Sequence, residues 1–318
     1  MRDNKFDIMK GIGILSVIIG HSYFPSILKD LIFTWHMPMF FIISGYFYKS
    51  YPNGEYIKRN ICQLIYPYVI TSLAIIGIMI LKDIIKKESE TSQYIIGALI
   101  GNGSYNNPIF SEYFIGAIWF LLALCWCRII YNALNICITD EYQRNVTLVC
   151  LSCCAAFMGT FVFVPTNLLQ GMQALLFFHV GYLWRIGKIQ EITSSYMWGG
   201  IIILCILSVM SGSMSMVRCY YGFYPINVLA SIGITIGLYK ICTFIGDNLV
   251  SRFLAYCGRI SLIILCVHNI EFICGFGSYL RNYLSFPSYS GVAIHLMVSL
   301  ICSTLLLQIK YIRSLFHL

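Results

Sequence analysis

The chain has 318 residues, of which 58% are hydrophobic and only 11% are charged. An average soluble domain carries about a quarter charged residues, so this chain could not give a soluble domain a water-facing surface of normal polarity. The composition excludes an ordinary soluble protein and predicts an all-α, polytopic integral membrane protein. The net charge is +8, but the basic residues are spread over many loops rather than gathered in one patch. This distribution predicts no nucleic-acid partner.

Hydropathy and helix-breaking residues predict about ten transmembrane helices, since a spanning helix needs about 20 mainly apolar residues. The expected segments are residues 8–24, 31–48, 64–81, 113–135, 146–164, 168–184, 197–211, 225–245, 259–277 and 290–309. The seventh segment is short, which predicts a tilted or partly re-entrant helix. No room is left for a separate soluble domain, so we expect one transmembrane domain over residues 1–318.

The basic residues of the connections predict the orientation. With ten spans, both termini and every second loop share one side, which holds 15 of the 21 Lys and Arg residues, Arg2 among them. The positive-inside rule therefore predicts that both termini are cytoplasmic. The opposite side has one large polar loop, roughly 82–112, in which lysines mix with Glu88 and Glu90. We interpret this loop as either an outward-facing lid or docking loop, or a simple connector.

Fourteen cysteines are scattered through the sequence, mostly in apolar runs, where cysteine packs as a small hydrophobic residue. No combination of cysteine and histidine has the spacing of a zinc site. The sequence therefore predicts no bound metal.

Ionisable residues in and beside the first apolar segment are the first candidates for function. Charged or imidazole groups inside a membrane cost several kcal/mol unless they find partners or line a cavity. Asp7 and Lys10 are helical neighbours at i, i+3. His21 follows eleven residues after Lys10, so the two side chains differ by only about 20° around the helix and by about 16 Å along it. The three residues predict a polar stripe on one helix face, and nearby glycines predict close approach of a neighbouring helix or a ligand.

Two further segments carry histidines at membrane depth. His36 lies about one turn into the second expected span, at a depth similar to that of His21. The two imidazoles predict either a proton-handling pair or two separate hydrogen bonds to carbonyls or water. In the ninth segment, His268 and Glu271 are neighbours at i, i+3. His295 stands alone in its segment, and we interpret it as a structural hydrogen-bonding residue.

Several short motifs are spread over nearly the whole chain. They are Asp7-Ile8-Met9-Lys10-Gly11, Gly20-His21, His36-Met37-Pro38-Met39-Phe40-Phe41-Ile42-Ile43-Ser44-Gly45-Tyr46, Leu64-Ile65-Tyr66-Pro67-Tyr68, Trp119-Phe120-Leu121, and Gly258-Arg259-Ile260-Ser261 followed by His268. Together they resemble the acyltransferase 3 family of membrane acyltransferases, most closely its polysaccharide or fucose O-acetyltransferase-like subgroup. The family has an Arg-x-x-Arg motif before its third helix, whereas this chain has Lys58-Arg59-Asn60-Ile61-Cys62-Gln63.

The resemblance implies a multi-pass O-acetyltransferase of the bacterial inner membrane that acts in cell-envelope polysaccharide biosynthesis. It would move an acetyl or other short acyl group from cytoplasmic acyl-CoA, with acetyl-CoA as co-substrate, to a hydroxyl of an extracytoplasmic or lipid-linked glycan. The histidine that matches His21 is essential in the family, so His21 is the expected general base, with Asp7 and Lys10 beside it. Lys58 and Arg59 are expected to bind the CoA phosphates. The expected acceptor-binding residues are His36, Ser44, Trp119, His268 and Glu271.

Two other classes of protein stay open from the residues alone. A transporter or flippase for polysaccharides or lipid-linked sugars would also place ionisable groups inside a helical bundle, although the chain shows no internal repeat. A sensory or structural membrane protein would need no buried Asp-Lys-His stripe. The sequence does not decide the acceptor sugar, the acyl group, direct transfer against a covalent relay, or the oligomeric state.

Overall fold

The computed structural model describes residues 4–22, 24–87, 89–107, 109–189, 194–212, 214–285, 287 and 290–316. Within these ranges the ordered elements are helices, without any strand, and one isolated bridge joins Ser215 and Tyr220. The predicted all-α class is therefore confirmed. Arg2, one of the cations used to predict the orientation, and Glu88, named in the predicted loop 82–112, lie outside the described residues.

The chain forms two compact units, and each is assembled from separate stretches of sequence. Unit 1 contains Met1–Tyr48, Leu176–Met216 and Tyr220–Ser261, and unit 2 contains Lys49–Leu175, Val217–Cys219 and Leu262–Leu318. Both units combine residues that are far apart in the chain. The expectation of one acyltransferase domain over residues 1–318 stays a prediction.

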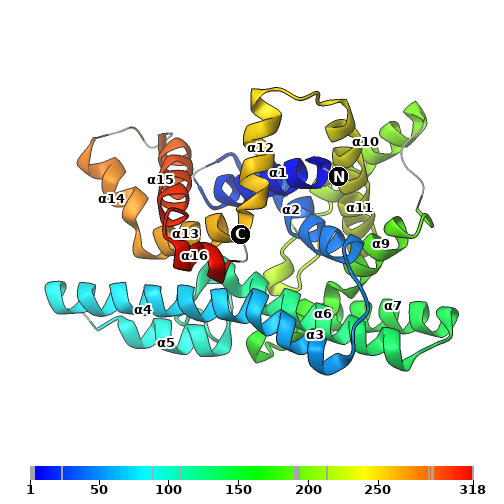
Figure 1. Ribbon diagram of the computed structural model, residues 1–318, viewed down its shortest axis with the longest axis horizontal. Helices are drawn as coiled ribbons and strands as arrows, with labels where there is room; N and C mark the ends of the chain where they lie inside the picture. Colours follow the sequence, from blue (N-terminus) through cyan, green and yellow to red (C-terminus); the bar gives the residue numbers. More distant parts are fainter. Residues whose placement is uncertain are drawn as a thin grey trace. The chain divides into compact units, whose positions relative to one another are not determined.

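Unit 1 is built of helices that cross at glycines. Its helices are α1 (Asn4–His21), α2 (Ser26–Tyr46), α9 (Leu175–Arg185), α10 (Ser195–Met210), α11 (Tyr224–Phe244) and α12 (Leu249–Arg259). In Figure 1, α1 crosses α12; at this crossing Gly11 faces the carbonyl of Leu254 and Gly258 faces the carbonyl of Asp7. A Cβ atom at either glycine would overlap the facing oxygen. Small residues allow such close approach of helices in membranes. The sequence predicted a helix or a ligand close to these glycines, and at Gly11 the neighbour is a helix.

A second crossing in unit 1 joins α2 to α9 in the same way. Gly45 of α2 faces the carbonyl of Phe178, and Gly181 of α9 faces the carbonyl of Ile42. A side chain at either glycine would again overlap the backbone of the facing helix. Two pairs of glycines therefore fix how α1 and α2, the helices that carry the predicted polar stripe and His36, pack against their neighbours.

Unit 2 contains one long helical run and several shorter helices. The run covers 34 residues, Asn53–Lys86, and consists of α3 (Asn53–Asn60), the π-helical turn η1 (Ile61–Ile65) and α4 (Tyr66–Lys86). The other elements are α5 (Thr91–Ile100), η2 (Gly116–Ile118), α6 (Trp119–Cys137), α7 (Glu141–Met158), η3 (Pro165–Asn167), α8 (Leu168–Gln173), α13 (Ser261–Cys274), α14 (Phe276–Tyr283), α15 (Gly291–Leu306) and α16 (Lys310–Leu315). α4 and α5 lie side by side (Figure 1), joined where the Tyr68 hydroxyl donates to the Ala98 carbonyl at 2.6 Å. A further short turn is η4 (Met216–Arg218).

A helix occupies each of the ten predicted segments, although several boundaries differ. The first segment is α1, which begins at Asn4 and ends at His21, and the sixth is divided between α8 and α9. Within the described residues, the helical segments that are long and apolar enough to cross a membrane are Ser26–Tyr46, Asn53–Lys86, Gly116–Cys137 and Tyr224–Phe244, and the bent pair of α12 and α13 would add a fifth. The polytopic membrane class is therefore confirmed. The count of about ten crossings and the cytoplasmic termini stay predictions.

The prediction of a loop at residues 82–112 is wrong in part. α4 continues to Lys86, and Thr91–Ile100 form the apolar helix α5. Asp83 fixes the start of α5, because its carboxylate accepts hydrogen bonds from the Thr91 amide at 2.9 Å and the Thr91 hydroxyl at 2.6 Å. A ten-residue apolar stretch is too short to be predicted as a membrane span, which explains why α5 was not expected.

The irregular segment after α5 is organised by buried asparagines. The side-chain amide of Asn102 donates to the carbonyls of Phe110 at 2.6 Å and Tyr113 at 3.0 Å. Asn167, which precedes α8, donates to the carbonyl of Gly101 at 2.7 Å. Backbone that leaves a helix inside a membrane protein needs such partners, because no water is available to supply them.

Candidate functional site

The polar stripe of α1 begins with an ion pair. Lys10 Nζ lies 2.8 Å from Asp7 Oδ1. The Asp7 side chain is 3% exposed, whereas Lys10 keeps 24% of its side chain exposed. The i, i+3 spacing thus brings the two side chains together as predicted, and the lysine is the more accessible partner.

His21 is the last residue of α1 and is half-buried. The carboxyl end of a helix carries partial negative charge from its unpaired carbonyls, which stabilises a cation there. Phe33 of α2 meets the rings of both candidate histidines edge-on, with its ring centroid 6.1 Å from that of His21 and 5.2 Å from that of His36. The two imidazoles that were expected at a similar depth therefore share one aromatic neighbour in unit 1.

His36 is buried and already uses one ring nitrogen within its own helix. Its Nδ1 lies 2.7 Å from the carbonyl oxygen of Ile32, one turn earlier in α2. A carbonyl can only accept, so this nitrogen carries the proton. The contact matches the alternative in which His36 hydrogen-bonds a carbonyl. Ser44 follows two turns later on α2, half-buried and next to the glycine crossing with α9.

Trp119 of unit 2 is buried at the start of α6, and the turn before it is bound by Asn269 of α13. The Ala117 amide donates to Asn269 Oδ1 at 2.5 Å, and Asn269 Nδ2 donates to the Ile115 carbonyl at 2.9 Å. Between them, Gly116 has a φ of +80°, and a Cβ there would overlap Asn269 Oδ1. Glycine is therefore required at this turn, and Asn269 is a positioning residue that the sequence did not reveal.

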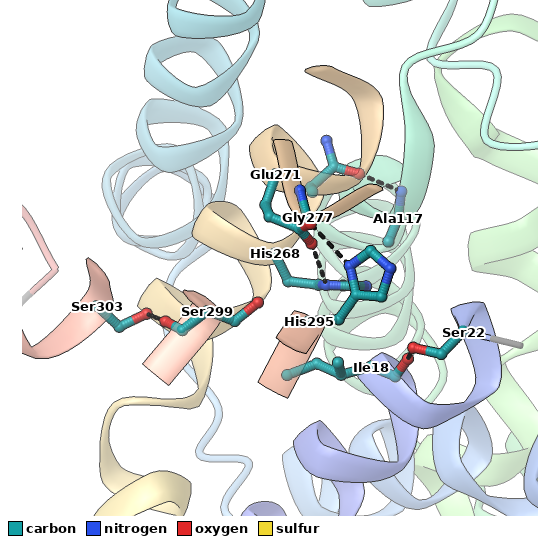
Figure 2. A network of polar contacts seen from close by, with 10 residues as sticks. Ile18, Ser22, Ala117, His268, Glu271, Gly277, His295, Ser299 and Ser303 are labelled. Carbon is teal, nitrogen blue, oxygen red and sulfur yellow. Dashed lines mark hydrogen bonds and ion pairs between the residues drawn. The ribbon is translucent and has the colours of Figure 1, made fainter. Parts of the chain in front are cut away.

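The ninth predicted segment contributes a buried carboxylate with three neighbours. Figure 2 shows Glu271 of α13 facing His268, His295 and Gly277. Glu271 Oε1 lies 2.7 Å from His295 Nδ1 and accepts the Gly277 amide at 2.8 Å. Glu271 Oε2 lies 3.6 Å from His268 Nδ1. The predicted pair of His268 and Glu271 is thus part of a larger cluster that joins α13, α14 and α15.

The expected hydrogen bond of His295 is confirmed, and its partner is Glu271, 24 positions earlier in the chain, which the sequence did not indicate. A weak sequence signal does exist. His295, Ser299 and Ser303 follow each other at intervals of four on α15, so they share one helix face in an otherwise apolar segment. A polar face on a membrane helix indicates contact with protein or a cavity rather than with lipid.

The predicted donor-binding residues lie in unit 2 on the last turn of α3. Lys58 and Arg59 are both exposed. The Arg59 guanidinium lies 4.5 Å from the ring centroid of Tyr51, a distance typical of a cation–π contact. The aromatic ring fixes the direction of the cation without neutralising it.

A further cation reaches the same helical run from α6. Arg128 Nη1 lies 3.4 Å from Asn60 Oδ1 and 3.3 Å from Gln63 Oε1, the first before and the second within the π-helical turn η1. Single π-helical turns are found frequently at functional sites. Arg128 therefore joins Lys58 and Arg59 as a basic residue at this end of the run.

The predicted site residues fall into two sets. Unit 1 contains Asp7, Lys10, His21, His36 and Ser44, and unit 2 contains Lys58, Arg59, Trp119, His268 and Glu271. Phe33 links two histidines of the first set, and α13 carries both His268 and Glu271 of the second.

Metal binding has no support in the described part of the chain, where no group of three or more His, Cys, Asp or Glu side chains is arranged to hold an ion. Cys150 and Cys153 do have Cys-x-x-Cys spacing. Both are exposed on α7, and the structure describes them as free thiols.

Comparison with known proteins assigns the chain to a family. The model of the acyltransferase 3 family, described as an acyltransferase domain, matches residues 3–308. No curated protein and no solved structure matches the chain. The match covers nearly the whole sequence, including both sets of site residues, and the helices described above are those of a membrane protein. The chain therefore belongs to the acyltransferase 3 family and is a membrane acyltransferase.

Proposed function

We propose that the protein is an O-acyltransferase that moves an acetyl or another short acyl group from acyl-CoA to a hydroxyl of a carbohydrate, with His21 as the general base. The observation that carries this proposal is the position of His21. A half-buried imidazole ends α1, and the Asp7–Lys10 ion pair lies three turns earlier on the same helix. The membership of the acyltransferase 3 family supports the reaction class.

The reaction needs a base that is neutral before the step and cationic after it. The hydroxyl oxygen of the acceptor attacks the thioester carbonyl while His21 takes the hydroxyl proton. The tetrahedral intermediate then collapses, the C–S bond breaks, and the leaving CoA thiolate takes the proton from His21, which returns to its neutral form. The partial negative charge at the end of α1 stabilises the imidazolium that forms. Histidine suits this role because its ordinary pKa lies near neutral pH.

Lys10 is the residue of this stripe that can meet an anionic or polarised group. Its side chain is partly exposed, and Asp7, which is buried, holds the ammonium at 2.8 Å. In the proposed mechanism Asp7 therefore positions Lys10 rather than touching the substrate. Lys10 in turn guides the acyl donor towards His21.

The donor side of the proposal uses unit 2. CoA carries phosphate groups, and Lys58 and Arg59 are exposed cations that can pair with them by charge-assisted hydrogen bonds. With both termini in the cytoplasm, the part of the helical run that carries Lys58 and Arg59 would also lie on that side and would meet acyl-CoA there. The acceptor would be a surface polysaccharide or a lipid-linked sugar of the cell envelope, and the protein would lie in the bacterial inner membrane. His36, Ser44, Trp119, His268 and Glu271 are the residues proposed to shape the acceptor site.

The decisive experiment is the substitution His21→Ala in the full chain. Purified protein in detergent is incubated with labelled acetyl-CoA and envelope glycan, and both glycan labelling and release of free CoA thiol are followed. Loss of a general base costs about 10²–10⁴-fold in rate, so His21→Ala should remove nearly all transfer at unchanged abundance in the membrane. His179→Ala serves as a control, because His179 is also a histidine of unit 1.

Two results would contradict the proposal. Residual activity of His21→Ala above about a tenth of the wild-type rate is incompatible with loss of a general base. With the purified protein in lipid vesicles, movement of a labelled lipid-linked sugar across the membrane without any release of free CoA would favour the transporter or flippase instead.

A further inference from the structure

The geometry points to His295 as a hydroxyl-binding residue of unit 2 that contacts the carbohydrate acceptor, with Glu271 as the residue that positions it. This inference rests on the proposed function, because the acceptor is a carbohydrate only if that function holds. It adds to the predicted site a residue that sequence spacing had set aside.

Glu271 determines which nitrogen of His295 carries the proton. An ionised carboxylate has no proton to donate, so Nδ1 of His295 donates to Oε1 across 2.7 Å. In the neutral imidazole the other nitrogen, Nε2, then carries a lone pair. This arrangement, in which a carboxylate holds one nitrogen and leaves the other to act, is the one that orients imidazoles in acyl-transfer sites.

The Nε2 atom of His295 is left for an outside partner. Among the described residues no hydrogen bond reaches this atom, and the side chain keeps 13% of its surface exposed. His268, the other imidazole beside Glu271, is 1% exposed. His295 is therefore the accessible side of the cluster, and His268 is enclosed.

Glu271 and His295 are also contacted by the backbone of α14. Gly277 approaches so closely that a Cβ there would overlap Glu271 Oε1 and lie 2.8 Å from His295 Nδ1. The backbone can therefore come close enough for the Gly277 amide to donate to the same oxygen that accepts from His295. A buried carboxylate is costly inside a membrane protein unless it has partners. Here the hydrogen bond to Glu271 fixes the orientation of the His295 ring.

A second polar group lies on the same face of α15. Ser299, one turn after His295, is fully buried, and its Oγ has no hydrogen-bond partner among the described residues. Buried hydroxyl groups almost always have a partner in proteins, either protein or water. Ser299 therefore indicates a water or ligand hydroxyl about one turn of α15 beyond His295. A carbohydrate supplies neutral hydroxyl groups, which can both donate to Nε2 and accept from Ser299.

The test uses a substitution that separates binding from structure. In His295→Asn, the amide nitrogen takes the place of Nδ1 and can still donate to Glu271, but no atom replaces Nε2. With methyl glycosides of glucose, galactose and fucose as acceptor probes, the KM for the acceptor should rise about five- to tenfold, the loss of one hydrogen bond. The KM for acetyl-CoA and the abundance in the membrane should not change.

Glu271 is tested by a conservative and a disruptive variant. In Glu271→Gln one carbonyl oxygen can still accept both hydrogen bonds that Oε1 now accepts, so the acceptor KM should change by no more than about threefold. Glu271→Ala leaves the imidazole without its partner and should raise the acceptor KM at least as much as His295→Asn. An equal loss in the Gln and Ala variants would mean that the charge of Glu271, and not its position, is needed.

Chemical modification of the wild-type chain provides a measurement that does not depend on turnover. Diethyl pyrocarbonate reacts with accessible, unprotonated imidazole nitrogens, so it should modify His295 and spare His268, as mapped by mass spectrometry. The methyl glycosides should protect His295. An unreactive His295, or an unchanged acceptor KM in His295→Asn, would overturn the inference. Absence of any acyl transfer by the wild-type protein, with His295 still reactive and protected, would instead count against the proposed function.

Discussion

The two units differ in the contacts that surround their predicted site residues. Around the polar stripe and His36 of unit 1, close contacts join backbones: Gly11 and Gly258 bring α1 against α12, and Gly45 and Gly181 bring α2 against α9. In unit 2 the contacts run from side chains to irregular backbone, as where Asn269 binds the turn at residues 115–117. Regular helices satisfy their own backbone, whereas the turns of unit 2 need side chains to do so.

This difference changes how a buried polar residue is interpreted. Asn269 and Asn102 in unit 2 have a structural task that explains their burial. The ionisable residues of α1 lie on a regular helix whose packing depends on glycines, so the backbone of that helix does not require them. The polar stripe of unit 1 is therefore the sharper functional candidate, and each polar residue of unit 2 has to be tested against a structural role.

The largest effect is expected where the backbones of unit 1 meet. Gly11→Leu or Gly258→Leu should separate α1 from α12, because a side chain would overlap the facing carbonyl. Overpacking typically costs about 1–3 kcal/mol, and backbone that cannot yield costs more, so we expect a loss above about 3 kcal/mol and little folded protein. The thermal midpoint in detergent and the abundance in the membrane measure this effect.

The control for these variants is Gly199→Leu. Gly199 lies on α10 of the same unit, and a Cβ there would meet nothing within 4 Å. This substitution should leave the thermal midpoint unchanged. Equal losses at Gly11 and Gly199 would show that leucine is harmful for another reason, and the contrast between the two units would lose its basis.

The sequence predicted well those features that repeat along a single helix. The ion pair of Asp7 and Lys10 and its place on the helix of His21 follow from helical spacing alone. The apolar segments likewise led to a helix in each expected place. Local periodicity is enough for these features, because the residues concerned share one element.

Features that depend on contacts between distant segments were not predicted. His295 and Glu271 are 24 residues apart, and Asn269 binds a turn more than 150 residues earlier. Spacing within one helix carries no information about such pairs. α12 was missed for another reason: its arginines interrupt the apolar pattern, although Asn248 and Ser251 form a capping box at its start.

The next largest effect is expected in unit 2, at Asn269, which binds the turn before Trp119. Asn269→Ala removes both hydrogen bonds to the turn before Trp119 and leaves the Ala117 amide and the Ile115 carbonyl without them. Buried backbone groups that lose a partner cost about 1–3 kcal/mol, so we expect a loss of about 2–3 kcal/mol in stability. Thermal unfolding in detergent provides the measurement. Asn282→Ala, an exposed asparagine of unit 2, should stay within about 0.5 kcal/mol of the wild type.

A smaller effect is expected at the cations of α3, which the proposal gives to the donor rather than to the fold. Arg59→Ala should raise the KM for acetyl-CoA about three- to fivefold without lowering stability, because the side chain is exposed. The effect should shrink in high salt, which screens exposed charges. Arg59→Lys keeps the charge and loses the planar contact with Tyr51. Its KM for acetyl-CoA should therefore lie between the values for the wild type and for Arg59→Ala.

Lys86→Ala is the matched control for Arg59→Ala. Lys86 is also exposed and ends the same helical run, about 40 Å away at 1.5 Å per residue. Its loss should leave the KM for acetyl-CoA unchanged. A fall in stability with unchanged KM in Arg59→Ala would mean that this part of unit 2 uses its charged residues for structure as well.

The smallest effect is expected at an exposed ion pair of unit 1, which contrasts with the buried pair on α1. Arg252 donates to both carboxylate oxygens of Asp247 at 2.7 Å, and each side chain is 68% exposed. These hydrogen bonds hold the pKa of the Asp247 carboxyl below its usual range. A carboxyl whose pKa is lowered by folding stabilises the fold above its unfolded pKa, and this contribution disappears as the pH falls through the folded value.

Arg252→Gln should therefore shift the thermal midpoint at neutral pH by no more than the scatter of the measurement, and by nothing in acid. Solvent screens an exposed pair, whereas Asp7→Asn leaves Lys10 beside a buried, uncharged side chain and should lower the midpoint clearly. If both substitutions had the same small effect, burial on α1 would not strengthen the Asp7–Lys10 pair. The stripe of unit 1 would then be as open to solvent as Asp247, and its claim to be a protected site for acyl transfer would fail.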